Sequence, residues 1–479
     1  MFTHPHEECG DGCCWIGAQL VEPVATRKEL LRADAKAIAA TSEEALIRKA
    51  GYALAQGVRK LAGKTAGLRV VVLAGPGLNG ADGKVAAKVL ERFGAKVTVV
   101  ELGSVSALPP CDVLVDAAIG TGLTRAFLPP TVHGTPLVVA CDVPSGLSGD
   151  TGEVFGHPIR ADLTVTFGAT KPGLLFGLGR ALAGEVIVAP LDLDLEPECW
   201  RVTNDDVANL PKLSTERHKW TVAVGVIAGS PGMEGAANFV AAAAFRAGAG
   251  MVRVATTANE LPMAREAVLM NRPTKGWPAL SRTFFDRCGA LVVGPGISRE
   301  PSLVTELTSF ITTTTQPLIL DADALVLLSA HGLLARTIAA RGDGAPVVLL
   351  PHDGEFEAMM GRAPGSDRLG AARQLAQATG ATVLLKGPTT VVADAKSSDV
   401  FVIDGAPSNL ATAGSGDVLA GICGALLARP SNWPVAKTVA HGARLHAMAG
   451  ARGVGVGLLS SELPRHVAEI LSEEVTHGR

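Results

Sequence analysis

Aromatic residues are scarce in this sequence. They make up 4% of the chain, as 13 Phe, 5 Trp and 1 Tyr, whereas the hydrophobic share is 47%. A core of this size must therefore be built from aliphatic side chains, with close backbone approach at many of the 55 glycines. Parallel α/β sheets, which are buried on both faces, have this composition.

An excess of positive charge is also missing. Lys and Arg number 43 against 46 acidic residues, which leaves a formal net charge of −3. No basic stripe and no Lys/Arg cluster with interleaved aromatics appears, so the sequence excludes a nucleic-acid interface. A small-molecule partner is expected instead.

No apolar run reaches the roughly 18 residues that would span a bilayer. The most apolar stretch, Ala236 to Val252, is interrupted by Asn238 and Arg246, and we interpret it as a buried Ala-rich helix. The N-terminus lacks a basic region followed by an apolar run, so no secretory signal is predicted. The expected location is therefore the cytoplasm.

The 8 cysteines indicate no disulfide framework. Cys9, Cys13 and Cys14 lie near His4 and His6, and a metal site there is conceivable. Their spacing fits no zinc pattern, however, because Cys13 and Cys14 are adjacent. We interpret residues 1–20 as an N-terminal extension.

Short aliphatic runs alternate with helical patterns along the rest of the chain. This alternation predicts an α/β fold with parallel sheets and crossover connections. An acidic and polar stretch between about Leu191 and Lys219 breaks the pattern, and a length of 479 residues suits two or three domains. We predict one domain over 21–208 and a second over 209–479.

The run from Asn409 to Asp417, Asn-Leu-Ala-Thr-Ala-Gly-Ser-Gly-Asp, precedes an apolar helical pattern. Its glycines expose backbone N–H groups at a helix N-terminus, where the helix dipole favours an anion. A carboxylate at Asp417 could then serve as a base towards a substrate hydroxyl. The structural alternative is an Asp that only caps the helix.

Further polar or glycine motifs follow apolar runs in this half: Gly294-Pro-Gly296, Asp321-Ala-Asp323, Pro351-His352 and Lys386-Gly-Pro-Thr-Thr390. Ligands of open α/β sheets bind at the carboxyl ends of the strands. We therefore expect these motifs to meet Asp417 at one sheet edge.

This ordered set resembles the NAD(P)H-hydrate dehydratase domain of the ribokinase-like superfamily. The resemblance implies removal of water from the (S)-hydrates of NADH and NADPH (NADHX and NADPHX), with ADP converted to AMP and phosphate. Asp417 would be the catalytic base, and Mg²⁺ is expected with the nucleotide. By the same resemblance the hydrate would contact Ala236, Gly296, His352 and Asp417, and the nucleotide would contact Lys386, Gly387, Pro388, Thr389, Thr390 and Gly416.

The N-terminal half carries its own glycine-rich run after a strand, from Gly75 to Gly83, of a kind that binds phosphate. Asp116 and Asp142 each end an aliphatic run. Carboxylates placed there need partners, which a cation or an acid–base role would supply. The alternative is that both aspartates only stabilise turns.

These motifs, together with Thr166 to Gly173, resemble the NAD(P)H-hydrate epimerase domain. The resemblance implies a Rossmann-like α/β/α sandwich that interconverts R and S hydrates with bound K⁺. Asp142 would be the acid–base residue, and Asn79, Asp116 and Ser145 would hold the cation. The substrate would contact Leu78, Asn79, Gly80, Ala81, Asp82, Gly120, Thr121, Gly122, Leu123, Thr124, Arg125, Ala126 and Asp142.

The first turn departs from this family, which usually has Asn-Asn-Gly-Gly-Asp where this chain has Leu78-Asn-Gly-Ala-Asp82. The resemblance of both halves implies a bifunctional repair enzyme that forms a homo-oligomer (tetramer or larger). Two alternatives to this function stay open. One is a ribokinase-like kinase of a small vitamin precursor. The other is an N-terminal half that binds without catalysing.

Overall fold

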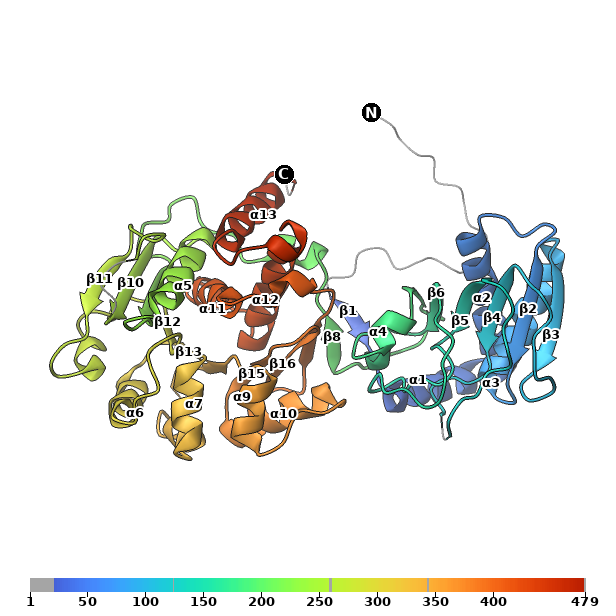
Figure 1. Cartoon of the computed structure of the whole chain (residues 1–479), viewed down its shortest axis with the longest axis horizontal. Helices are drawn as coiled ribbons and strands as arrows, with labels where there is room; N and C mark the ends of the chain where they lie inside the picture. Colours follow the sequence, from blue (N-terminus) through green and yellow to red (C-terminus); the bar gives the residue numbers. More distant parts are fainter. Residues whose placement is uncertain (1–20, 124, 258–260, 343, 478–479) are drawn as a thin grey trace. The chain divides into compact units, whose positions relative to one another are not determined.

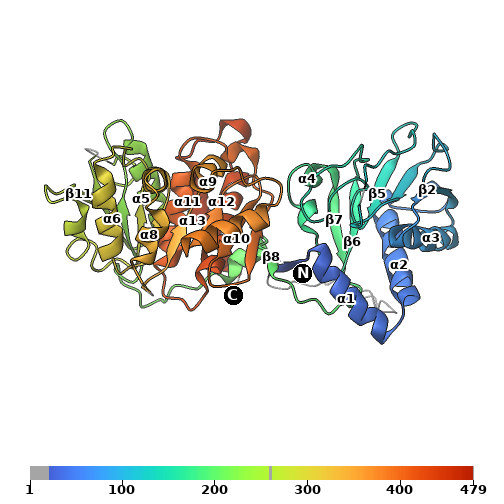
Figure 2. The same ribbon diagram turned by 90° about the horizontal axis from the view of Figure 1, so that it is seen from below.

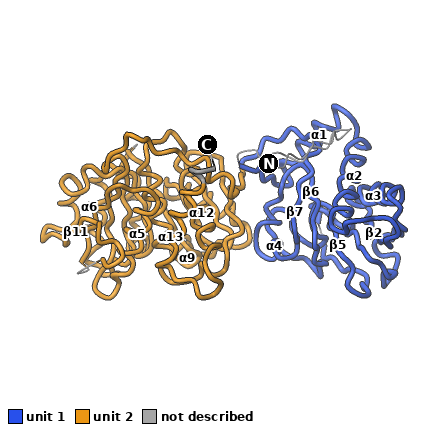
Figure 3. The backbone as a smooth tube through the Cα atoms, turned by 90° about the horizontal axis from the view of Figure 1, so that it is seen from above, with its two compact units in different colours: residues 1–198 blue, residues 199–479 orange. Residues whose placement is uncertain are grey.

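The computed structural model describes residues 21–477 except 124, 258–260 and 343 (Figure 1). The predicted extension, residues 1–20, lies outside the described residues. Two compact units, Met1–Glu198 and Cys199–Arg479, divide the chain (Figure 3). The division falls earlier than the predicted boundary after residue 208, because strand β8 (Cys199–Arg201) pairs with β17 (Val400–Ile403) of the second unit.

The first unit is built on a sheet whose strand order is β3-β2-β4-β5-β6-β7. Every neighbouring pair in it is parallel. The strands are β2 (Arg69–Ala74), β3 (Lys96–Glu101), β4 (Val113–Ala117), β5 (Leu137–Cys141), β6 (Leu163–Phe167) and β7 (Glu185–Ala189). Before them come β1 (Glu22–Val24), α1 (Arg27–Ala40) and α2 (Glu43–Ala62); α3 (Leu78–Arg92) and α4 (Gly179–Leu182) follow β2 and β6.

Helices α2 and α3 cover one face of this sheet (Figure 2). Their small residues, such as Ala53 and Ala87, pack there on Val72 and Val115. The opposite face is covered by irregular segments that contribute Leu108 and Phe127 to a second apolar cluster.

Local signals explain the helix boundaries. Thr26 and Glu29 form a capping box at the start of α1, and the Ser42 hydroxyl caps α2. Helix α3 begins at Leu78, so most of the glycine-rich run up to Gly83 is the beginning of a helix. Glycine is required inside this run because a Cβ on Gly80 would lie 1.9 Å from the Gly75 carbonyl oxygen.

The second unit has one mixed sheet, in the order β8-β17-β16-β15-β14-β13-β12-β9-β10-β11. Pairing is antiparallel at β15–β16 and β16–β17 and parallel at the other junctions. The remaining strands are β9 (Ala223–Ile227), β10 (Met251–Thr256), β11 (Val268–Asn271), β12 (Ala290–Val293), β13 (Leu318–Leu320), β14 (Val347–Leu349), β15 (Thr382–Leu385) and β16 (Thr390–Asp394).

Helices cover both faces of this sheet (Figure 1). One layer holds α5 (Glu234–Arg246), α11 (Ser415–Leu427), α12 (Val435–Ala451) and α13 (Leu463–His477). The other holds α6 (Leu303–Thr313), α7 (Asp323–Ala330), α8 (Leu334–Ala339), α9 (Asp353–Met360) and α10 (Arg368–Thr379). The predicted fold class, α/β in two domains with parallel sheets, is confirmed.

Helices α5 and α11 pack closely, and this contact positions the N-terminus of α11. A Cβ on Gly421 would lie 2.3 Å from the Val240 carbonyl oxygen, so only glycine fits between the two helices.

Among the described residues, none of the helices combines the length and the apolar character needed to cross a membrane.

Candidate active sites

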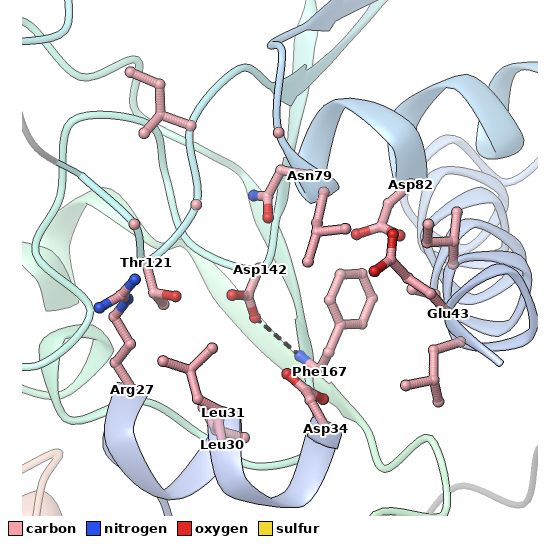
Figure 4. Close-up of a pocket in the computed structure, with 18 of the residues that line it drawn as sticks. Arg27, Leu30, Leu31, Asp34, Glu43, Asn79, Asp82, Thr121, Asp142 and Phe167 are labelled. Carbon is pink, nitrogen blue, oxygen red and sulfur yellow. Dashed lines mark hydrogen bonds between the residues drawn. The ribbon is translucent and has the colours of Figure 1, made fainter. Parts of the chain in front are cut away.

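A cavity of about 420 Å³ opens in the first unit, at the carboxyl ends of its strands (Figure 4). Helices α1 and α2 contribute apolar residues such as Leu30 and Leu46, together with the ionisable Asp34. Asp82 reaches the cavity from α3 and Asp142 from the segment after β5. The cavity thus combines apolar surface with ionisable groups from several elements.

Asp142, the predicted acid–base residue, follows β5 in a left-handed backbone conformation with φ of 66°. Such a conformation costs a non-glycine residue roughly 1–3 kcal/mol, so the surrounding contacts must hold it in place. Its Oδ1 accepts hydrogen bonds from the Thr166 hydroxyl, the Phe167 backbone N–H and the Lys171 ammonium. Because these described donors all contact Oδ1, Oδ2 is left for a ligand.

Lys171 is the buried partner of Asp142, and it was not among the predicted site residues. Its side chain is almost completely buried, and its ammonium also donates to the Phe167 carbonyl at 2.6 Å. A buried lysine requires a partner, and here Asp142 is that partner. The available signal was the isolated lysine in the Thr166 to Gly173 motif, four residues after a buried strand.

The predicted cation ligands Asn79, Asp116 and Ser145 are brought together. The fully buried Asp116 carboxylate accepts from the Ser145 N–H at 2.8 Å and the Ser145 hydroxyl at 2.6 Å. The Asn79 amide nitrogen donates to the Cys141 carbonyl at 2.7 Å. Cys141 is the last residue of β5, and its neighbour Ala140 pairs with Asp116 of β4. Burial raises the pKa of Asp116, and the hydrogen bonds from Ser145 oppose this rise.

The predicted substrate residues are divided between the cavity and its surroundings. Those that line it are Leu78, Asn79, Asp82, Gly120, Thr121, Gly122, Arg125 and Asp142. Gly80, Ala81, Leu123 and Ala126 are not among the lining residues, and Thr124 lies outside the described residues. Arg27 and Asp34 of α1 do line it, although no sequence motif pointed to them.

In the second unit, Lys386 is the cation at the strand edge. It follows β15, and its ammonium pairs with the Asp321 carboxylate at 2.8 Å and lies 3.9 Å from that of Glu355. Burial lowers the pKa of Lys386, but these two carboxylates outweigh burial and hold the pKa above its usual value. The lysine therefore keeps its charge.

Asp417 lies in the first turn of α11, whose N-cap is Gly414 with φ of 89°. The aspartate is thus not the capping residue, which removes the structural alternative for it. A Cβ on the neighbouring Gly416 would lie 3.6 Å from the Lys386 ammonium nitrogen, so the helix turn and this cation are adjacent. Burial, and then the charge of Asp321, raise the pKa of Asp417 to about 7.

His352 has a structural task besides its predicted one. It is the N-cap of α9, and its Nδ1 accepts from the Glu355 backbone N–H at 3.2 Å. A neutral His352 therefore carries its proton on Nε2, on a side chain that is largely exposed. Its Nε2 lies 3.5 Å from the Glu355 carboxylate, which also lies 3.9 Å from the Lys386 ammonium.

The remaining predicted residues lie at the same edge. Ala236 contacts Gly296, since a Cβ on Gly296 would lie 3.0 Å from that of Ala236. Gly387 to Thr389 form the tight turn between the antiparallel strands β15 and β16, and Thr390 begins β16. Pro388 is exposed in this turn, whereas Thr389 and Thr390 are buried.

Comparison with known proteins agrees with this division into two units. The profile of a family described as NAD(P)H-hydrate dehydratase matches residues 224–472, and that of the YjeF-related protein N-terminus matches residues 43–108 and 100–173. A bifunctional NAD(P)H-hydrate repair enzyme of Mycobacterium tuberculosis (strain CDC 1551 / Oshkosh) is 37% identical over 83% of this chain and 87% of its own. The chain belongs to the family of bifunctional NAD(P)H-hydrate repair enzymes.

A further relative and a solved structure are also similar to this chain. The bifunctional NAD(P)H-hydrate repair enzyme of Escherichia coli (strain K12) is 32% identical over 85% of each chain. A ribokinase-like superfamily protein of Enterococcus faecalis V583 is similar in structure, with a TM-score of 0.51 and 22% identity over 58% of this chain and 96% of its own. That likeness confirms the ribokinase-like fold of the second unit.

Proposed function

We propose that this chain repairs hydrated nicotinamide cofactors, with the first unit acting as the epimerase and the second as the dehydratase. The first would interconvert the R and S hydrates of NADH and NADPH. The second would dehydrate the S form while ADP is converted to AMP and phosphate. Family membership supports both activities, and the arrangement of Asp417 beside Lys386 carries the assignment of the chemistry.

In the second unit, Asp417 removes the proton of the hydrate hydroxyl. A carboxylate with a pKa of about 7 is suited to this role near neutral pH, because half of it is ionised there. The alkoxide attacks the terminal phosphoryl group of ADP, which the Lys386 ammonium and the N-terminal N–H groups of α11 orient. The phosphate then leaves with help from the lone pair of the ring nitrogen, and loss of a ring proton restores the double bond.

Mg²⁺ is part of this proposal because it neutralises phosphate charge during phosphoryl transfer. The described residues contain no group of three His, Cys, Asp or Glu side chains arranged to hold a metal. The nucleotide phosphates, rather than a protein cage, would supply most of its ligands.

For the first unit we propose K⁺ at Asn79, Asp116 and Ser145. The donor set fits, because a buried carboxylate, an amide oxygen and a hydroxyl are hard oxygen ligands. The Asn79 amide nitrogen is engaged by the Cys141 carbonyl, so its oxygen is available. A bound cation would offset the buried negative charge of Asp116.

The test uses purified NADH hydrates with ADP and Mg²⁺, and absorbance at 340 nm follows the NADH formed. We expect complete recovery from a mixture of R and S hydrates. No recovery would contradict the proposal, and phosphorylated product without recovery would favour a kinase. The Asp142→Ala variant should stall near half of the mixture, and a wild-type chain that also stalls there would indicate a first unit that binds without catalysing.

A further inference from the structure

Asp82 is an unusual group in the cavity of the first unit. It is the fifth residue of α3, lines the cavity and is only 6% exposed. No hydrogen bond to its carboxyl group comes from the described residues, in contrast to Asp142 with its donors. A buried carboxyl group without a partner is costly unless a ligand or a proton satisfies it.

Asp82 and Asp142 reach the cavity from different elements. Figure 4 shows Asp82 on the helix and Asp142 on the segment after β5. Only Asp142 has a cation beside it, the Lys171 ammonium. The cavity therefore holds one carboxylate paired with a buried lysine and one carboxyl group with no counter-charge of its own.

We propose that Asp82 is a second catalytic residue of the epimerisation, working as a general acid opposite Asp142. This inference rests on the proposed epimerase function and adds the second group that inversion at a carbinol carbon needs. Departure of the hydroxyl and return of water take place on opposite faces of the ring. One carboxyl group alone does not serve both faces.

The step is balanced in atoms and electrons. Asp82 donates its proton to the hydroxyl, the C–O bond breaks, and water leaves while the ring nitrogen lone pair forms a C=N bond. A second water adds to the other face as Asp142 removes its proton. Asp82 ends ionised and Asp142 protonated, and a proton carried through the released water restores both, so no oxidant or other co-reactant is required.

The surrounding charges favour the protonated acid. Burial, and then the negative charges of Asp142 and Asp34, raise the pKa of Asp82 to about 8. The other groups at the cavity are Glu43 of α2, the Lys171 ammonium, which is bound to Asp142, and Arg27 and Arg125, which are exposed. Below pH 8 Asp82 therefore holds a proton to donate.

The experiment compares the wild-type chain with Asp82→Asn on purified R hydrate, after subtraction of spontaneous epimerisation. The expected kcat loss is on the order of 100-fold or more, with KM changed less than threefold. The wild-type rate should decline above about pH 8 as Asp82 loses its proton, and the variant should lack this decline. The matched control is Glu91→Gln, which removes an exposed carboxylate from the same helix and should change neither constant.

Two measurements keep failure of this inference separate from failure of the proposed function. Dehydration of the S hydrate should be unchanged in Asp82→Asn, which shows that the second unit is folded, and hydrogen–deuterium exchange of peptides from β2 and β4 should be no faster than in the wild type at pH 7, which shows that the first unit is folded. Epimerisation in H₂¹⁸O should place one labelled oxygen in each molecule of product. Enzyme-catalysed epimerisation that retains the original oxygen, or a variant that loses affinity but keeps kcat, would overturn the role of Asp82; no wild-type epimerisation would overturn the proposed function itself.

Discussion

Replacing Lys171 by Met should be among the most damaging single substitutions in the first unit. The Lys171 side chain is 2% exposed, and its ammonium contacts the Asp142 carboxylate and the Phe167 carbonyl. Methionine keeps most of the volume but leaves the carboxylate buried without a counter-charge. Breaking a buried ion pair in this way costs about 3–5 kcal/mol.

That cost is large compared with the whole stability of a domain, which is about 5–15 kcal/mol. At 1.4 kcal/mol per factor of ten, we expect the unfolded fraction of this unit to rise by at least a hundredfold. Hydrogen–deuterium exchange of peptides from β5 and β6 measures this rise in the full chain. Exchange in β12 and β13 of the second unit should stay unchanged and serves as the internal reference.

The double variant Lys171→Met with Asp142→Asn is the decisive comparison. It removes both charges, so its stability should recover part of the loss seen in Lys171→Met alone. Lys60→Met, which breaks the exposed pair with Glu185, should leave exchange nearly unchanged. The reasoning fails if Lys171→Met exchanges like the wild type, or if the double variant is less stable than the single one.

Three further results are expected. Asp417→Asn should lower the rate of dehydration by about 10²–10⁴-fold while calorimetry still detects nucleotide binding; a rate within tenfold of the wild type would contradict a base at this position. The wild-type rate should fall as pH decreases through about 7, because protonation removes the base, and a flat profile from pH 6 to 8 would exclude Asp417 as the titrating group. The pKa of Asp82 is raised to about 8 from 3.8, so the folded state binds this proton more tightly than the unfolded state, and the resulting stabilisation is complete below pH 4 and is lost as pH rises through 8. Asp82→Asn should therefore stabilise the first unit at pH 8.5 relative to the wild type, which slower hydrogen–deuterium exchange of α3 would report. Equal exchange of α3 in the two proteins would contradict the burial argument.

The sequence by itself indicated the alternation of strands with helices and the sheet edge at which the motifs of the second half gather. Short aliphatic runs such as Arg69–Ala74 and Thr382–Leu385 are strands in the structure. A strand that is buried on both faces needs several consecutive apolar residues, and such a run can be recognised in the sequence without knowledge of its neighbours. Because the carboxyl ends of parallel strands share one edge, Lys386 and Asp417 could be placed together before any contact was known.

Only the tertiary structure decided which partner each ionisable group has. Lys171 and Asp142 are separated by 29 positions, and nothing local in either segment shows that they form a buried pair. The same holds for Asp82, whose lack of a hydrogen-bond partner among the described residues depends on helices, strands and loops far apart in the chain. Desolvation and charge–charge interaction are set by everything within several ångströms, and sequence periodicity carries no record of those neighbours.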